Sequence, residues 1–272
     1  VQFGHFLANA VRGDLGTSFY THAPVINEIA ARLPHTIELA LLAIILATLA
    51  GVAIGVVSAI WQYSWFDNVM MVLALLGVSM PIFWSGLMFA GLFSVTLGWL
   101  PGTNLTDPEI VFVHHTEFYL FESLFTGQWS AFLDILRHMI MPAVTLAAYS
   151  TGLIARMTRS SMLEVIHQDY VRTARAKGLP DRTVYLVHAL RNALLPVITV
   201  IGLQVGALLG GAVLTETVFA LPGIGSLAVT AAKNSDYPLI RATVLLSAAF
   251  FVLVNLLVDL FYSVLDPRIR YD

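Results

Sequence analysis

Five long apolar runs, almost free of charged residues, dominate this sequence. They are Thr36–Ile60, Val69–Leu97, Met139–Ala155, Ala193–Thr215 and Ala242–Leu265. About 20 apolar residues in a helix cross the hydrocarbon core of a bilayer. Lipid offers backbone N–H and C=O groups no partner, so such runs fold as helices. The sequence therefore predicts an all-α integral membrane protein with five spans.

The composition excludes most other classes of protein. Charged residues make up 11% of the chain and hydrophobic residues 58%, with a mean hydropathy of +0.80, whereas soluble domains carry about 25% charged residues. The formal charge of −3 offers no basic face to nucleic acid. The absence of cysteine excludes disulfides and thiolate metal sites. We expect a multi-pass protein of the lipid bilayer with neither a nucleic-acid partner nor a bound metal.

The Lys and Arg residues predict the orientation. Seven of them lie between the third and fourth runs, and the tail adds two, whereas the segments on the opposite side hold five. Because cytoplasmic loops carry the excess of positive charge, we predict a cytoplasmic loop over residues 156–192 and a cytoplasmic tail over 266–272. Residues 36–265 form the transmembrane domain, and 1–35 form an extracytoplasmic segment. An extracytoplasmic segment 1–35 needs an apolar segment ahead of it to carry it across the membrane, and residues 1–30 show no such signal. We therefore expect a further span ahead of Val1, which makes six spans in all.

The predicted cytoplasmic loop has its own helical pattern. Residues Ser160–Lys177 show three-and-four spacing typical of a helix. Gly178 and Pro180 end it, and Asp181 can cap a second helix that runs from Arg182 toward residue 192. A loop that is helical and rich in Arg predicts a docking surface for a cytoplasmic partner.

Several signatures of chemistry do not occur in the chain. It lacks the Gly-x-x-x-x-Gly-Lys-Ser/Thr nucleotide loop, the His-Glu-x-x-His metal motif and the Gly-x-Ser-x-Gly hydrolase motif. We therefore predict no catalytic residue, no cofactor and no enzymatic activity. An intramembrane enzyme is the distant alternative.

Six stretches identify a family. They are Gly77–Trp84 (GVSMPIFW), Arg156–Glu164 (RMTRSSMLE), Asp169–Leu179 (DYVRTARAKGL), His188–Pro196 (HALRNALLP), Leu214–Gly225 (LTETVFALPGIG) and Asp266–Arg270 (DPRIR). Together they resemble the permease subunits of the dipeptide, oligopeptide and nickel family of ABC importers, most of all the dipeptide-permease B type. The resemblance covers nearly the whole chain.

This resemblance implies the fold, partners and function. The fold is the transmembrane domain of a type I ABC importer, whose first span would precede this chain. A second homologous permease completes the translocation path for di- or oligopeptides, two cytoplasmic ATPase subunits drive it, and an extracytoplasmic binding protein delivers the solute. The location is the plasma or inner membrane of a prokaryotic cell. Nickel or another small solute is the alternative substrate.

The same resemblance assigns a coupling segment in the predicted loop. Arg172, Thr173 and Ala174, with Gly178, hold the places of the family's Glu-Ala-Ala and Gly residues. We expect the segment to contact an ATPase subunit, with small alanines permitting close approach; its residues are Asp169, Tyr170, Arg172, Thr173, Ala174, Arg175, Ala176, Lys177 and Gly178.

Two polar residues within the spans are candidates to line the path. Gln204 lies at depth in the fourth run, and Ser79 lies beside Pro81, which should bend the second run. Glycines four residues apart predict close helix packing; they are Gly51 and Gly55, and Gly202, Gly206 and Gly210.

Overall fold

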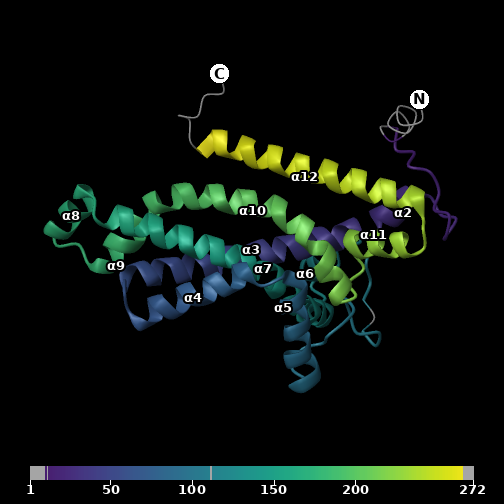
Figure 1. Cartoon of the computed structure of the whole chain (residues 1–272), viewed down its shortest axis with the longest axis horizontal. Coiled ribbons are helices and arrows are strands. Elements are labelled where there is room, and N and C mark those ends of the chain that lie inside the picture. Colours follow the sequence, from purple (N-terminus) through teal and green to yellow (C-terminus); the bar gives the residue numbers. More distant parts are fainter. Residues whose placement is uncertain (1–9, 11, 111, 266–272) are drawn as a thin grey trace. The chain divides into compact units, whose positions relative to one another are not determined.

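The computed structural model describes residue 10, residues 12–110 and residues 112–265, and helices are the only named regular elements there. Figure 1 shows their order along the chain. The elements are α2 (Val25–Ala30), α3 (Leu33–Ile60), α4 (Trp65–Ser79), α5 (Ile82–Phe89), η1 (Ala90–Thr96), α6 (Tyr119–Phe125), α7 (Trp129–Ile166), α8 (Asp169–Ala176), α9 (Asp181–Thr183), η2 (Val184–Ala189), α10 (Leu190–Val218), α11 (Ile224–Lys233) and α12 (Tyr237–Leu265). Both η elements are π-helical.

Four helical stretches are long and apolar enough to cross a membrane: Val25–Ile60, Trp129–Ile166, Asp181–Leu208 and Tyr237–Val258. The predicted second span is a broken pair, Trp65–Ser79 and Ile82–Thr96, which makes up to five spans if it counts as one. The break lies at Met80, whose ψ is 136°, immediately before Pro81. Proline disfavours helical geometry in the residue that precedes it. The all-helical membrane architecture predicted from the sequence is confirmed.

The chain divides into two compact units, and the long helices contribute to both. Unit 1 comprises Val1–Leu41, Ile82–Thr145 and Leu209–Leu253. Unit 2 comprises Leu42–Pro81, Leu146–Leu208 and Val254–Asp272. The predicted tail, residues 266–272, and the start of the predicted N-terminal segment lie outside the described residues.

Close helix contacts hold unit 2 together. A Cβ added to Gly55 of α3 would lie 2.5 Å from Thr158 Cβ of α7, and one added to Gly152 of α7 would overlap the backbone oxygen of Ala74 in α4. Gly51 makes a similar approach to Ile154. The close packing predicted for the glycines of the first run is therefore confirmed. For Gly210 the prediction is wrong, since a Cβ there would meet nothing within 4 Å.

An ion pair with a buried carboxylate accompanies these contacts in unit 2. Arg159 of α7 donates from Nε to Asp67 Oδ1 at 2.6 Å and from Nη2 to Oδ2 at 2.7 Å. Asp67 is 1% exposed and also accepts from the backbone N of Tyr63 at 2.9 Å. Paired hydrogen bonds of this kind fix both orientation and distance. The start of α4 is thereby fastened to α7.

Buried carboxylates organise unit 1. Glu216 of α10 accepts from Thr36 Oγ1 at 2.6 Å and from Ser226 N at 3.1 Å, and Thr36 Oγ1 in turn accepts from Ile224 N at 2.9 Å. These bonds satisfy N–H groups at the start of α11, which have no partner within that helix. Glu38 of α3 accepts from the backbone N of Phe121 in α6 at 3.0 Å. Acidic side chains therefore tie the short helices of unit 1 to its long ones.

Candidate coupling surface

The segment predicted to couple with a partner forms a helix of its own, α8. The sequence predicted one helix over Ser160–Lys177, and this boundary is wrong because α7 ends at Ile166 and α8 begins at Asp169. Gln168 separates them in an extended conformation with ψ 152°, and its carbonyl accepts from Val171 N and Arg172 N to start the new helix. Asp169 in the first turn is favoured by the helix dipole.

The predicted end of this helix is confirmed. Gly178 has a φ of +78°, a left-handed conformation that glycine adopts without steric cost. The next helical stretch also differs from its prediction. Pro180 occupies the N-cap and Asp181 is the first helical residue, with no side-chain cap. Proline fits the start of this stretch because it needs no backbone N–H partner there.

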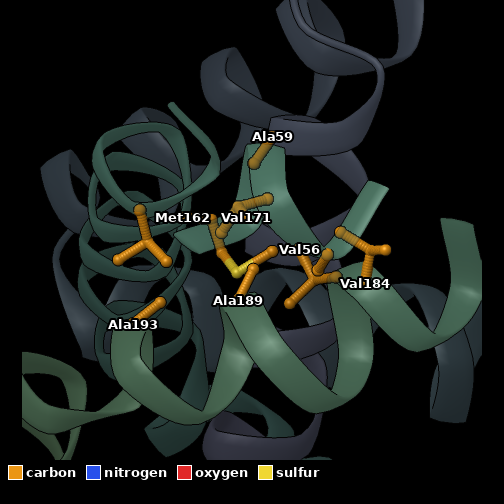
Figure 2. Close-up of a cluster of buried hydrophobic side chains, with 9 residues drawn as sticks. Val56, Ala59, Met162, Val171, Val184, Ala189 and Ala193 are labelled. Atoms are coloured by element: carbon orange, nitrogen blue, oxygen red, sulfur yellow. The ribbon is translucent and has the colours of Figure 1, made fainter. Parts of the chain in front are cut away.

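One face of α8 is buried in unit 2. Val171 and Ala174 are 0% and 8% exposed and belong to a cluster of apolar side chains from α3, α7, η2 and α10. Figure 2 shows Val171 beside Met162, with Ala189 and Val184 near them. Burying a valine side chain contributes about 1.5–3 kcal/mol. The Ala174 methyl group therefore lies on the buried face of α8, packed against the rest of unit 2, and is not part of the exposed face. We call this cluster the apolar seat of α8.

The opposite face of α8 is exposed and charged. Arg172 and Asp169 have side chains that are 70% and 97% exposed, with a separation of 3.6 Å between Arg172 Nη1 and Asp169 Oδ1. Pairs this exposed contribute little to stability, so both charges are available to a partner. The exposed residues of α8 and the turn after it are Asp169, Tyr170, Arg172, Thr173, Arg175, Ala176, Lys177 and Gly178.

Two side chains of α8 reach sideways to η2 and α10. Tyr170 Oη accepts from Asn192 Nδ2 at 2.7 Å and donates to His188 O at 3.3 Å. Arg175 donates from Nη2 to Tyr185 Oη at 3.0 Å, and its guanidinium carbon lies 5.3 Å from the centroid of that ring. Sequence reasoning missed these partners because neither spacing nor residue type pairs Tyr170 with Asn192.

The two path candidates lie in different surroundings. Ser79 is exposed at the end of α4, and its Oγ donates to Leu75 O at 2.8 Å. Gln204 is 9% exposed, and its Oε1 accepts from Ser150 Oγ at 3.1 Å between α7 and α10. The structure therefore uses the Gln204 amide inside unit 2 and leaves Ser79 accessible. Among the described residues no three His, Asp or Glu side chains gather to hold a metal ion.

Comparison with known proteins decides the family. Residues 51–271 match the family described as binding-protein-dependent transport system inner membrane component. The chain belongs to this family. It is a permease subunit of an ABC transporter and is located in the inner membrane.

Named relatives agree with this assignment. The dipeptide transport system permease protein of Alkalihalophilus pseudofirmus is 48% identical over 271 residues, covering 100% of this chain and 81% of that protein. The di/tripeptide transport system permease protein of Pseudomonas aeruginosa is 47% identical, with coverages of 100% and 81%. The Escherichia coli dipeptide permease is 47% identical over 274 residues, with coverages of 99% and 80%.

A solved structure has the same fold. An amino acid ABC transporter crystallised with histidines aligns with a TM-score of 0.59 and 13% identity, covering 97% of this chain and 98% of that one. At this identity the likeness concerns the fold alone. The predicted type I ABC importer transmembrane domain is confirmed.

Proposed function

We propose that this permease carries di- and oligopeptides along a path that it forms with a second, homologous permease. The observation that carries this proposal is the 47–48% identity, over almost the whole chain, to relatives named for dipeptide or di/tripeptide transport. A binding protein outside the membrane delivers the peptide, and two cytoplasmic ATPase subunits supply the energy. The chain itself performs no covalent chemistry.

The proposed role of α8 is to dock on an ATPase subunit. Its charged face, with Arg172 and Lys177, is exposed, and its apolar seat joins it to α3, α7 and α10. Because α8 is packed against these helices on one side and exposed on the other, a partner that displaces α8 would also displace the spans. Closure of the ATPases on ATP would then move these helices between outward-open and inward-open arrangements.

The path itself is proposed to pass Ser79, where the second predicted span breaks. Backbone groups released at a helix break can be tolerated at membrane depth where they line a water-filled cavity. Gln204 is proposed as a second polar contact, which requires its bond to Ser150 to open during the transport cycle. Cysteines placed singly at 79 and 204 in this cysteine-free chain would report water access with and without ATP.

Transport by the reconstituted complex tests the substrate. The chain, its partner permease, the ATPases and the binding protein are placed in proteoliposomes, and ATP-dependent uptake of a radiolabelled dipeptide is compared with uptake of Ni²⁺. We expect dipeptide uptake alone to depend on ATP. Uptake of Ni²⁺ without dipeptide would contradict the proposed substrate.

Charge reversal on α8 tests the docking surface. The double variant Arg172→Glu/Lys177→Glu should reduce co-purification of the ATPases by at least about tenfold, because it reverses the two positive charges that the proposal places in the interface, and charge complementarity across an interface sets which partner binds. Lys233→Glu, at an exposed cation that ends α11 in unit 1, is the matched control and should leave association unchanged. Equal co-purification of all three proteins would contradict the docking proposal.

A further inference from the structure

Helix α8 is joined to the rest of unit 2 in two different ways. The apolar seat holds it from below through Val171 and Ala174. A polar link holds it from the side, through Tyr170 Oη to Asn192 Nδ2 and to His188 O. Apolar contacts are non-directional, whereas hydrogen bonds weaken steeply as their angle and distance change. The polar link is therefore the attachment that responds to small rotations of α8.

The polar link ends at the His188 carbonyl, which belongs to an unusual stretch of backbone. His188 lies in η2, a π-helical turn that continues directly into α10. π-Helical turns are rare and occur frequently at functional sites. Because η2 and α10 are continuous, a displacement of the His188 carbonyl is carried into a long apolar helix that contains Gln204.

We infer that Tyr170 is a positioning residue that passes the movement of α8 into α10 through His188 and Asn192. This inference rests on the proposed docking of α8 on an ATPase. It assigns the Tyr170 hydroxyl to a contact within the chain, whereas the residue is 37% exposed beside the charged face. Arg175, through Tyr185, holds the preceding part of η2 in the same way.

The test separates energy use from transport. Tyr170→Phe keeps the ring and removes the hydroxyl, and so removes both hydrogen bonds. In the full complex in proteoliposomes, three quantities are measured: ATPases retained on purification, ATP hydrolysed in the presence of peptide-loaded binding protein, and dipeptide taken up per ATP. We expect association and hydrolysis to stay within about twofold of the parent. Uptake per ATP should fall about fivefold to tenfold, which corresponds to the loss of one or two hydrogen bonds.

Two companion variants make the assignment specific. Asn192→Ala removes one of the two bonds and should lower uptake per ATP by no more than Tyr170→Phe does. The double variant Tyr170→Phe/Asn192→Ala should be no worse than Tyr170→Phe, which already removes both bonds. Asn192→Gln keeps a side-chain amide that can donate to the tyrosine hydroxyl and should retain more of the coupling than Asn192→Ala. Tyr237→Phe, at an exposed tyrosine that begins α12, is the control for loss of a hydroxyl.

Each contrary outcome has a distinct meaning. If Tyr170→Phe takes up as much dipeptide per ATP as the parent, the inference is overturned and the docking proposal stands. If Tyr170→Phe loses the ATPases during purification, the hydroxyl belongs to the docking face and the inference is again overturned. If the charge reversal at residues 172 and 177 leaves association intact, the docking proposal fails, and the inference fails with it.

Discussion

In unit 2 the helices meet through glycines and small apolar side chains, whereas in unit 1 buried carboxylates join long helices to short ones. Gly55 and Gly152 bring backbones of α3, α4 and α7 close together. Glu38 and Glu216, which are 0% and 1% exposed, instead accept hydrogen bonds from backbone N–H groups and a hydroxyl. Unit 1 also has a close glycine contact, since a Cβ on Gly225 of α11 would overlap Val213 Cα of α10, so the buried carboxylates are what unit 1 adds to such contacts.

The difference follows from the backbone that each unit must accommodate. Where the long helices α3, α4 and α7 cross in unit 2, each satisfies its own backbone groups, so shape complementarity suffices at the crossing. Unit 1 contains the short helices α6 and α11, whose first N–H groups have no partner inside the helix. A carboxylate can accept several such bonds at once. In unit 1 buried acids thus lie where α6 and α11 begin.

The Arg159–Asp67 pair is the exception in unit 2, and its loss should have the largest effect. Arg159→Ala leaves the Asp67 carboxylate buried without its charge partner, which should destabilise the protein by about 3–5 kcal/mol. Thermal unfolding in detergent measures the change. Adding Asp67→Asn should recover part of the loss, because no buried charge then remains. An Arg159→Ala protein as stable as the parent would show that unit 2 does not depend on this pair.

A methyl group at the helix crossing tests the glycine contacts of unit 2. In Gly152→Ala the new Cβ overlaps the Ala74 carbonyl oxygen, which is backbone and cannot swing aside, so we expect a loss of up to about 3 kcal/mol. Gly210→Ala is the matched control, since its Cβ meets nothing within 4 Å and alanine favours a helix. Equal unfolding temperatures for the two variants would contradict the distinction.

An amide in place of a buried carboxylate tests unit 1. Glu216→Gln keeps the size of the side chain but replaces one acceptor oxygen with a donor, which leaves Thr36 Oγ1 or Ser226 N without its acceptor and should cost about 2 kcal/mol. Limited proteolysis between α10 and α12 should become faster in this variant. Glu164→Gln, at an exposed carboxylate of α7, should leave proteolysis unchanged; an identical pattern for all three proteins would count against the carboxylate scaffold.

The smallest effect concerns acid sensitivity at the start of α12. Burial raises the pKa of Asp236, but hydrogen bonds from the Ser18 hydroxyl and from the backbone N–H groups of Phe19, Leu239 and Tyr20 outweigh it and hold that pKa below its ordinary value near 3.8. A lowered folded pKa stabilises the protein above the unfolded pKa and ceases to do so as pH falls through the folded value. The stability gap between the parent and Asp236→Asn should therefore shrink below about pH 4, and a gap independent of pH would contradict this.

Sequence reasoning found the parts of the fold that are encoded locally. The apolar runs specify the long helices, Pro81 specifies the break after α4, and Gly178 specifies the end of α8. The start of α8 escaped because Gln168 carries no helix-breaking signal of its own. Its extended backbone is compatible with the burial of Val171 and Ala174 in the apolar seat, which is a tertiary effect.

The buried carboxylates were harder to foresee for a related reason. Glu38 is the one charged residue of the apolar run Thr36–Ile60, but nothing in the sequence points to its partner on α6. Glu216 lies 180 residues from Thr36, and no local pattern connects residues so far apart. The exposed charges of α8 were predictable from composition, whereas the division of that helix into buried, lateral and exposed faces needed the positions of α3, α7 and η2.

The shortness of α8 has a consequence for how the complex is built. Isolated helices of fewer than about 12–15 residues are marginal in water, and α8 has only 8. It therefore takes shape only after the ends of α3, α7 and α10 have come together to form its seat. If α8 docks on a cytoplasmic partner as proposed, that partner meets α8 only on a permease whose membrane helices are already assembled. The length of one helix would then set the order of assembly.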